Sequence, residues 1–122
     1  MSCLTRLNRL IRDVYARVRA HARGGQTMRE RDIEAQLVRM VRERGGLCWK
    51  FVSPGNNGVP DRIIVTPAGR VVFAELKTRT GQLSAIQLRQ IQALCLRGAD
   101  VRVLYGLEQV KAFVEEVFPR EI

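Results

Sequence analysis

The segment that decides the fold covers residues 58–77 and reads GVPDRIIVTPAGRVVFAELK. It contains two runs of β-branched and aromatic residues, 63–65 and 71–73, which are separated by the turn-forming residues 66–70. Runs of this composition on either side of a short turn are typical of two antiparallel strands. We therefore expect a β-hairpin, with strands of about six residues, inside a larger sheet.

Helix signals precede and follow this hairpin. Residues 27–44 begin with the capping-box pattern Thr27-x-x-Glu30 and carry an apolar stripe, and a strand over 47–52 and a turn over 53–58 follow. A second capping box, Ser84-x-x-Gln87, begins a helix over 84–97, which is followed by a strand over 101–105 and a helix over 107–118. The order αβββαβα predicts an α/β fold with a mixed sheet flanked by helices. The helical crossover makes the last strand parallel to its neighbour.

The N-terminal segment differs from the rest of the chain in charge. Residues 1–29 contain seven arginines and one acidic residue, Asp13, so six of the nine net positive charges lie there. Apolar residues at helical spacing predict an extra amphipathic helix in this segment; they are Leu4, Leu7, Ile11, Val14 and Val18. This stripe is a candidate homodimer interface, and packing on its own domain is the alternative. We divide the chain into this basic extension (1–26), a domain (27–118) and a tail (119–122).

Length and composition exclude several classes of protein. A chain of 122 residues with 46% hydrophobic residues suits one globular domain. No apolar run approaches the ~18 residues of a membrane span, so we expect no membrane partner. The net charge of +9 favours a polyanion such as nucleic acid. Three cysteines without CxxC spacing, and the lack of a secretory signal pattern, favour a cytoplasmic protein that is not secreted.

Three charged residues of the central segment are candidates for catalysis. Glu75 and Lys77 lie two positions apart on one predicted strand, so their side chains share a face. If the hairpin places Asp61 beside Glu75, two carboxylates converge next to a lysine ammonium. Mg²⁺ is commonly held by one or two carboxylates together with water and phosphate oxygens. The lysine would orient or deprotonate an attacking water, or neutralise charge on phosphorus. An exposed Glu75–Lys77 ion pair is the structural alternative.

The motifs GVPD at 58–61 and ELK at 75–77, followed by Gln87, resemble the PD-(D/E)XK nuclease superfamily and, more narrowly, the virus-type replication-repair nuclease (VRR-NUC) domain. The resemblance covers residues 28–117. It implies a restriction-endonuclease-like αβββαβ core, which agrees with the order predicted above. It also implies a site in which Asp61, Glu75 and the backbone carbonyl of Leu76 bind Mg²⁺ or Mn²⁺, with Lys77 as a catalytic residue.

The resemblance further implies an acidic residue on the first core helix. Archaeal Holliday-junction resolvases, which are similar, place it eleven residues before the glycine that ends that helix, and this position is Glu34. We expect Glu34 to act as a catalytic residue and metal ligand. Glu30, one turn earlier, is the alternative, although the predicted capping box already gives it a structural role. Gln87 also has two open roles, as the capping residue for Ser84 or as a supporting catalytic residue.

The implied function is metal-dependent endonuclease action on structured or branched DNA, such as Holliday junctions or flaps, in phage-type replication or repair. A non-catalytic nucleic-acid-binding module on a nuclease fold is the alternative. The predicted DNA-binding residues are Lys50, Asn56, Asn57, Arg62 and Arg79. A solvated side chain is the alternative for Lys50. We expect Trp49 and Tyr105 at the edges of the core rather than as platforms that stack on bases.

Overall fold

The structure is a computed structural model, and it describes residues 28–119, leaving 1–27 and 120–122 outside the described part. Its elements are helix α2 (Glu30–Glu43), strands β1 (Leu47–Lys50), β2 (Arg62–Val65) and β3 (Val71–Lys77), helix α3 (Ala85–Leu96), strand β4 (Val101–Tyr105) and helix α4 (Leu107–Val117). This is the αβββαβα order predicted from the sequence. The predicted N-terminal helix lies outside the described residues.

The four strands form one mixed sheet in the order β1-β2-β3-β4. β1 pairs antiparallel with β2, and β2 pairs antiparallel with β3, which confirms the predicted hairpin. β4 pairs parallel with β3, as a helical crossover through α3 requires. The site motifs therefore lie on the two central strands, where neighbours on both sides fix their positions.

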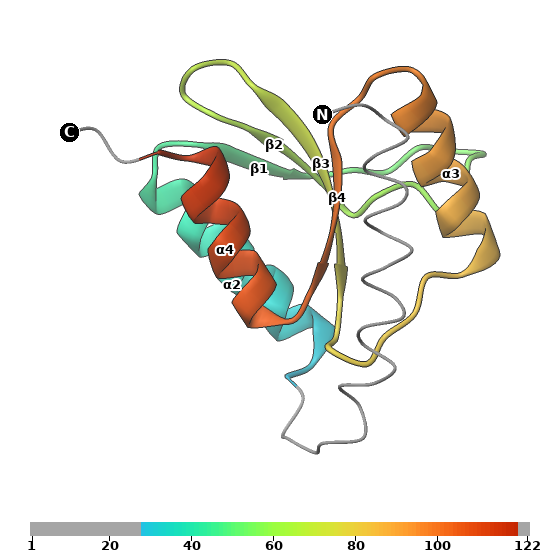
Figure 1. The fold of residues 1–122 in the computed structure, drawn as a ribbon, viewed down its shortest axis with the longest axis horizontal. Coiled ribbons are helices and arrows are strands. Elements are labelled where there is room, and N and C mark those ends of the chain that lie inside the picture. The colour runs from blue at the N-terminus through green and yellow to red at the C-terminus, as the bar shows by residue number, and fades with distance from the viewer. Residues whose placement is uncertain (1–27, 120–122) are drawn as a thin grey trace.

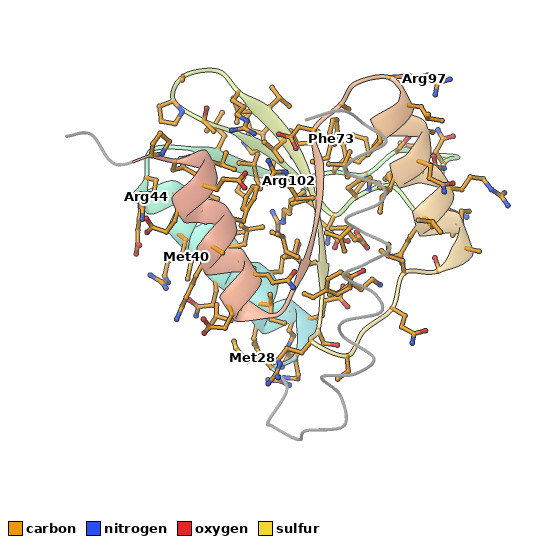
Figure 2. All side chains as sticks on the ribbon, in the orientation of Figure 1. Met28, Met40, Arg44, Phe73, Arg97 and Arg102 are labelled. Carbon is orange, nitrogen blue, oxygen red and sulfur yellow. The ribbon has the colours of Figure 1, made fainter. Side chains whose placement is uncertain are left out.

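Helices cover both faces of this sheet (Figure 1). α2 and α4 lie side by side on one face and contact each other. The core between them and the sheet buries Ile33 and Leu37 of α2 against Leu76 of β3. α3 lies on the other side of the sheet, where Ile91 and Cys95 pack with residues of β4 and with Phe73, which Figure 2 labels. Alternate residues of β3 thus enter two different cores, as strand geometry requires.

The two predicted capping boxes have different outcomes. At α3 the Ser84 hydroxyl accepts a hydrogen bond from the Gln87 backbone N–H, and the Gln87 side chain accepts one from the Ser84 N–H, so this capping box is confirmed. α2 instead begins at Glu30, with Arg29 at the N-cap position and no side-chain capping bond. Glu30 is therefore the first helical residue, and its predicted role in a capping box is wrong; Thr27 lies outside the described residues. Within 28–119, no helix is long and apolar enough to cross a membrane.

The two aromatic residues expected at the edges of the core differ in their exposure to solvent. Tyr105 is 3% exposed and belongs to the core beneath α3. Trp49 is 61% exposed, because β1 is an edge strand of the sheet. The expectation that Trp49 is part of the core is therefore wrong.

Candidate active site

The start of β2 and the end of β3 bring Asp61 and Glu75 together. Arg62 is paired with Ala74 in the β2–β3 register, so the residues next to them, Asp61 and Glu75, are neighbours across the two strands. The Asp61 carboxylate accepts a hydrogen bond from the backbone N–H of Leu76 at 2.9 Å. Its own backbone carbonyl accepts one from the Phe51 N–H at 2.8 Å, which anchors the residue to the neighbouring strand segment. The predicted convergence of these two carboxylates is therefore present.

Glu75 is a buried carboxylate with too few partners. Its side chain is 1% exposed, and its Oε2 atom has no hydrogen-bond donor among the described residues. Burial, followed by the negative charge of Asp61, raises the pKa of Glu75 from about 4.5 to about 8. The ammonium of Lys77 acts in the opposite direction, and the charge of Glu30 raises this pKa further. The ionised pair is thus unfavourable in the protein alone, and a bound cation would relieve it.

Gln87 joins helix α3 to this pair. Its Nε2 donates a hydrogen bond of 2.7 Å to Oε1 of Glu75, while its Oε1 accepts the N–H of Ser84 in the capping box at 2.9 Å. The sequence left the capping role and the supporting role as alternatives, and both contacts are made at once by the two ends of one amide. The start of α3 therefore holds Glu75 in place.

A glycine allows the loop before β2 to lie against α3. Gly58 has φ +84°, and a Cβ atom there would lie 3.0 Å from the backbone carbonyl carbon of Ile86 and 3.1 Å from the Gln87 nitrogen. A side chain at this position would therefore be strained and crowded by backbone. Nε2 of Gln90 also donates to the Asn57 carbonyl at 3.0 Å. These contacts fix the distance between the segment that carries Asp61 and the helix that carries Gln87.

Lys77 and Leu76 complete the predicted catalytic motif. Lys77 is half-buried and shares a face of β3 with Glu75, because the two lie two positions apart. Leu76 points to the opposite face and is fully buried under α2 and α4. Its N–H binds Asp61, and its carbonyl stays a predicted metal ligand.

The two acidic candidates of α2 have different surroundings. Glu34 Oε1 accepts a hydrogen bond of 2.7 Å from Nε of Arg62, and the two side chains form a half-buried ion pair. Glu30 is exposed, yet its charge acts on Glu75. The structure thus pairs Glu34 with an arginine and brings Glu30, one turn nearer the start of the helix, into electrostatic range of the carboxylate pair.

The predicted DNA-binding residues fall into two groups. Lys50, Asn56, Asn57 and Arg79 are exposed. Arg62 is half-buried; besides its bond to Glu34, its Nη1 lies 3.4 Å from the Cys48 carbonyl oxygen. Its guanidinium is therefore held inside the fold. The role of the four exposed side chains in DNA binding stays a prediction.

The donor set is compatible with a hard divalent cation. Among the residues from 28 to 119, no group of three or more His, Cys, Asp or Glu side chains is arranged to hold a metal ion. Two protein carboxylates are nevertheless sufficient for Mg²⁺, which retains several of its waters. The unpartnered Oε2 of Glu75 and the like charge of Asp61 are the two features that such an ion would satisfy.

Comparison with known proteins gives two informative similarities. "Putative nuclease p44" of Acyrthosiphon pisum secondary endosymbiont phage 1 is 44% identical over 77 residues, which make up 63% of this chain and 83% of that protein. A solved structure described as "VRR_NUC domain" matches with a TM-score of 0.66 and 28% identity, over 70% of this chain and 94% of that chain. No family model matches the sequence. Each similarity extends over more than four fifths of the other protein.

Proposed function

Because this chain belongs to the VRR-NUC domain family of nucleases, we propose that it is a metal-dependent endonuclease that hydrolyses phosphodiester bonds in DNA. The observation that carries this proposal is the buried pair of Asp61 and Glu75. Two carboxylates of like charge lie together, and one of them is 1% exposed with an unpartnered oxygen. A purely structural role gives no reason to retain such a pair, whereas a cation-dependent reaction does.

We propose that Asp61 and Glu75 hold Mg²⁺ or Mn²⁺. A divalent ion at this position supplies an activated water and compensates negative charge on the phosphate. The chain itself orients the ligands: the Leu76 N–H holds Asp61, and the Gln87 amide holds Glu75. The ammonium of Lys77, on the same face as Glu75, would neutralise charge that develops on the phosphate oxygens or orient the attacking water.

For the third acidic residue we favour Glu30 over Glu34. α2 begins without a capping box, so Glu30 has no structural role as a capping residue. Glu34 is engaged by Arg62, while the charge of Glu30 reaches Glu75. Glu30 would act on a bound cation from a distance, through water or by its charge alone.

For the substrate we propose structured or branched DNA, such as Holliday junctions or flaps, in phage-type replication or repair. The net charge of +9 supports a polyanionic substrate, and exposed Lys50 and Arg79 supply positive charge within the described domain. We propose cytoplasmic action, in a bacterial or phage-infected cell, because the three cysteines of the sequence lack the spacing of a disulfide framework or a CxxC site.

We also propose a homodimer. Four-way junctions are two-fold symmetric, so two copies of one site match their geometry. The candidate interface, the apolar stripe of residues 4–18, lies outside the described part of the chain. Light scattering at ~100 μM should give twice the monomer mass, and a monomer at this concentration would exclude all but very weak association.

Incubation with fluorescently labelled DNA tests the function directly. The substrates are a blunt duplex, a flap and a four-way junction, each with Mg²⁺, with Mn²⁺ and with EDTA. We expect cleavage of the branched substrates only where a divalent ion is present. Tight binding without cleavage under every metal condition would instead support the non-catalytic nucleic-acid-binding module.

A further inference from the structure

Trp49 lies on the same face of the sheet as the carboxylate pair. Cys48 and its partner Ile64 belong to the core beneath α2 and α4, so the next residue of β1, Trp49, points to the opposite face. Trp49 is paired with Ile63, and Ile63 with Phe73, which faces α3. Glu75 follows Phe73 by two positions and therefore shares this face.

Two further aromatic residues share this face of the sheet with Trp49 and the site. Phe51, two residues after Trp49, meets Phe73 edge to face with 5.6 Å between ring centroids. The Phe51 N–H binds the carbonyl of Asp61. Asp61 lies one strand across and two residues along from Trp49, so their Cα atoms are about 8 Å apart by strand geometry.

The surroundings of Trp49 suit a nucleic acid. Its side chain is 61% exposed, and the flanking Leu47 is 46% exposed, which leaves a flat apolar surface on an edge strand. Residues 47–60 contain one basic residue, Lys50, and no acidic residue. Proteins that bind single strands combine exposed aromatic rings, on which bases stack, with positive charge that follows the backbone. Here the exposed ring of Trp49 and the ammonium of Lys77 lie on one face of the sheet, together with two carboxylates suited to a cation.

We propose that Trp49 stacks on an unpaired base of the DNA substrate, within a few nucleotides of the scissile phosphate. The enzyme would then prefer DNA whose bases are unpaired beside the cut. This inference rests on the proposed function, because it names the feature of the substrate that the same site reads. Phe51, Phe73 and Lys77 lie on the same face of the sheet as Trp49.

Intrinsic fluorescence tests the contact without any cleavage, because the chain contains one tryptophan. The full-length Asp61→Ala variant is titrated in EDTA with a ten-nucleotide oligothymidine and, separately, with a blunt hairpin duplex. We expect the free protein to emit as an exposed indole, oligothymidine to quench this emission strongly, and the blunt duplex to quench it little. Unchanged emission with oligothymidine, equal quenching by the duplex, or buried-indole emission of the free protein would each overturn the proposal.

Kinetics separate the inference from the proposed function. With a flap substrate, Trp49→Ala should raise KM at least tenfold and leave kcat within twofold, while Trp49→Phe should recover most of the loss. Leu96→Ala, which truncates an exposed apolar side chain at the end of α3, is the matched control, and it should change neither constant. An equal effect of both alanine variants, or loss of a dimer in Trp49→Ala, would overturn the inference and assign the surface to protein contacts. Quenching by oligothymidine without metal-dependent cleavage by the wild type would refute the nuclease and leave the base contact standing.

Discussion

Asp61 and Arg62 are consecutive residues, yet each lies beside a different glutamate, and the two glutamates have different environments. Arg62 meets Glu34, and opposite charges lie 2.7 Å apart between Nε and Oε1. Asp61 meets Glu75, and the two charges have the same sign. Consecutive strand residues point to opposite faces, so the first pair lies toward α2 and the second toward α3.

The two pairs differ in whether their charges and hydrogen-bonding atoms are satisfied within the protein. The Glu34–Arg62 pair is neutral by itself, and Nη1 of Arg62 also donates to the Cys48 carbonyl. The Asp61–Glu75 pair has a hydrogen bond to each carboxylate, and when both are ionised it still has an uncompensated charge and an unpartnered oxygen. Burying like charges is unfavourable unless something compensates them. We infer that the first pair stabilises the fold, while the second needs a cation from solution.

The largest expected effect is the loss of cleavage on breaking the like-charge pair. Asp61→Ala and Glu75→Ala should each lower the cleavage rate at least ~1,000-fold, because the metal contributes several kcal/mol to the transition state. Lys77→Ala should lower it ~100-fold or more. The affinity for DNA should be unchanged or higher, because less negative charge faces the phosphates. Gel assays measure both, and exposed Glu108→Ala serves as the control. Metal-dependent cutting by either purified carboxylate variant would refute the site.

The second effect is a dependence of stability on pH. The pKa of Glu75 is about 8 in the folded protein and near 4.5 when unfolded, so between these values the folded state binds more protons. The contribution of Glu75 to the stability of the metal-free protein is therefore fully present below pH 4.5 and is lost as the pH rises through 8. The loss from Glu75 should be a few kcal/mol.

Denaturant unfolding in EDTA from pH 5 to 8.5 measures this, with Glu75→Gln as the comparison. Glu75→Gln should lack the pH-dependent contribution of Glu75, and at pH 8 it should be more stable than the wild type. Mg²⁺ should then stabilise the wild type at pH 8 and leave Glu75→Gln unchanged, because a ligand stabilises only the state that binds it. Parallel pH profiles for the two proteins would contradict the proposed burial of an uncompensated charge.

The third effect separates the two glutamates of α2. Glu34→Ala leaves Arg62 without its partner and should lower the free energy of unfolding by about 2 kcal/mol. Breaking a fully buried pair costs ~3–5 kcal/mol. The loss is smaller here because 19% and 23% of the two side chains are exposed. Glu30→Ala should leave stability within ~0.5 kcal/mol and lower cleavage about tenfold. Comparing unfolding with cleavage rates for both variants tests this. A larger loss of activity in folded Glu34→Ala would restore the original sequence prediction.

The order of the elements could be predicted from the sequence because its signals are local. The β-branched and aromatic runs at 63–65 and 71–73 define two strands, and the Ser84-x-x-Gln87 box defines the start of α3. The convergence of Asp61 and Glu75 follows from the same local rule, since hairpin pairing and the two-residue period fix which side chains are neighbours.

What could not be predicted depends on contacts between distant elements. Which glutamate of α2 reaches the site depends on where the helix begins and how it lies on the sheet, and Arg62 competes for one of them. Trp49 is exposed because β1 is an edge strand, and sheet order is not a local property. The two contacts of Gln87 require the actual position of α3 against β3.

The smallest expected effect isolates the bond that supports the like-charge pair. Ser84→Ala removes only the capping hydroxyl and should cost about 1 kcal/mol of stability, with cleavage unchanged. Gln87→Ala removes both its capping contact and the hydrogen bond to Glu75. At pH 8.5, where Glu75 is ionised, it should cost about 1–2 kcal/mol more than Ser84→Ala, because a buried carboxylate oxygen loses its donor. It should also slow cleavage about tenfold, because Glu75 is no longer held in position. If the two variants have equal stability and equal activity, Gln87 acts as a cap alone, and the support of Glu75 must come from elsewhere in the fold.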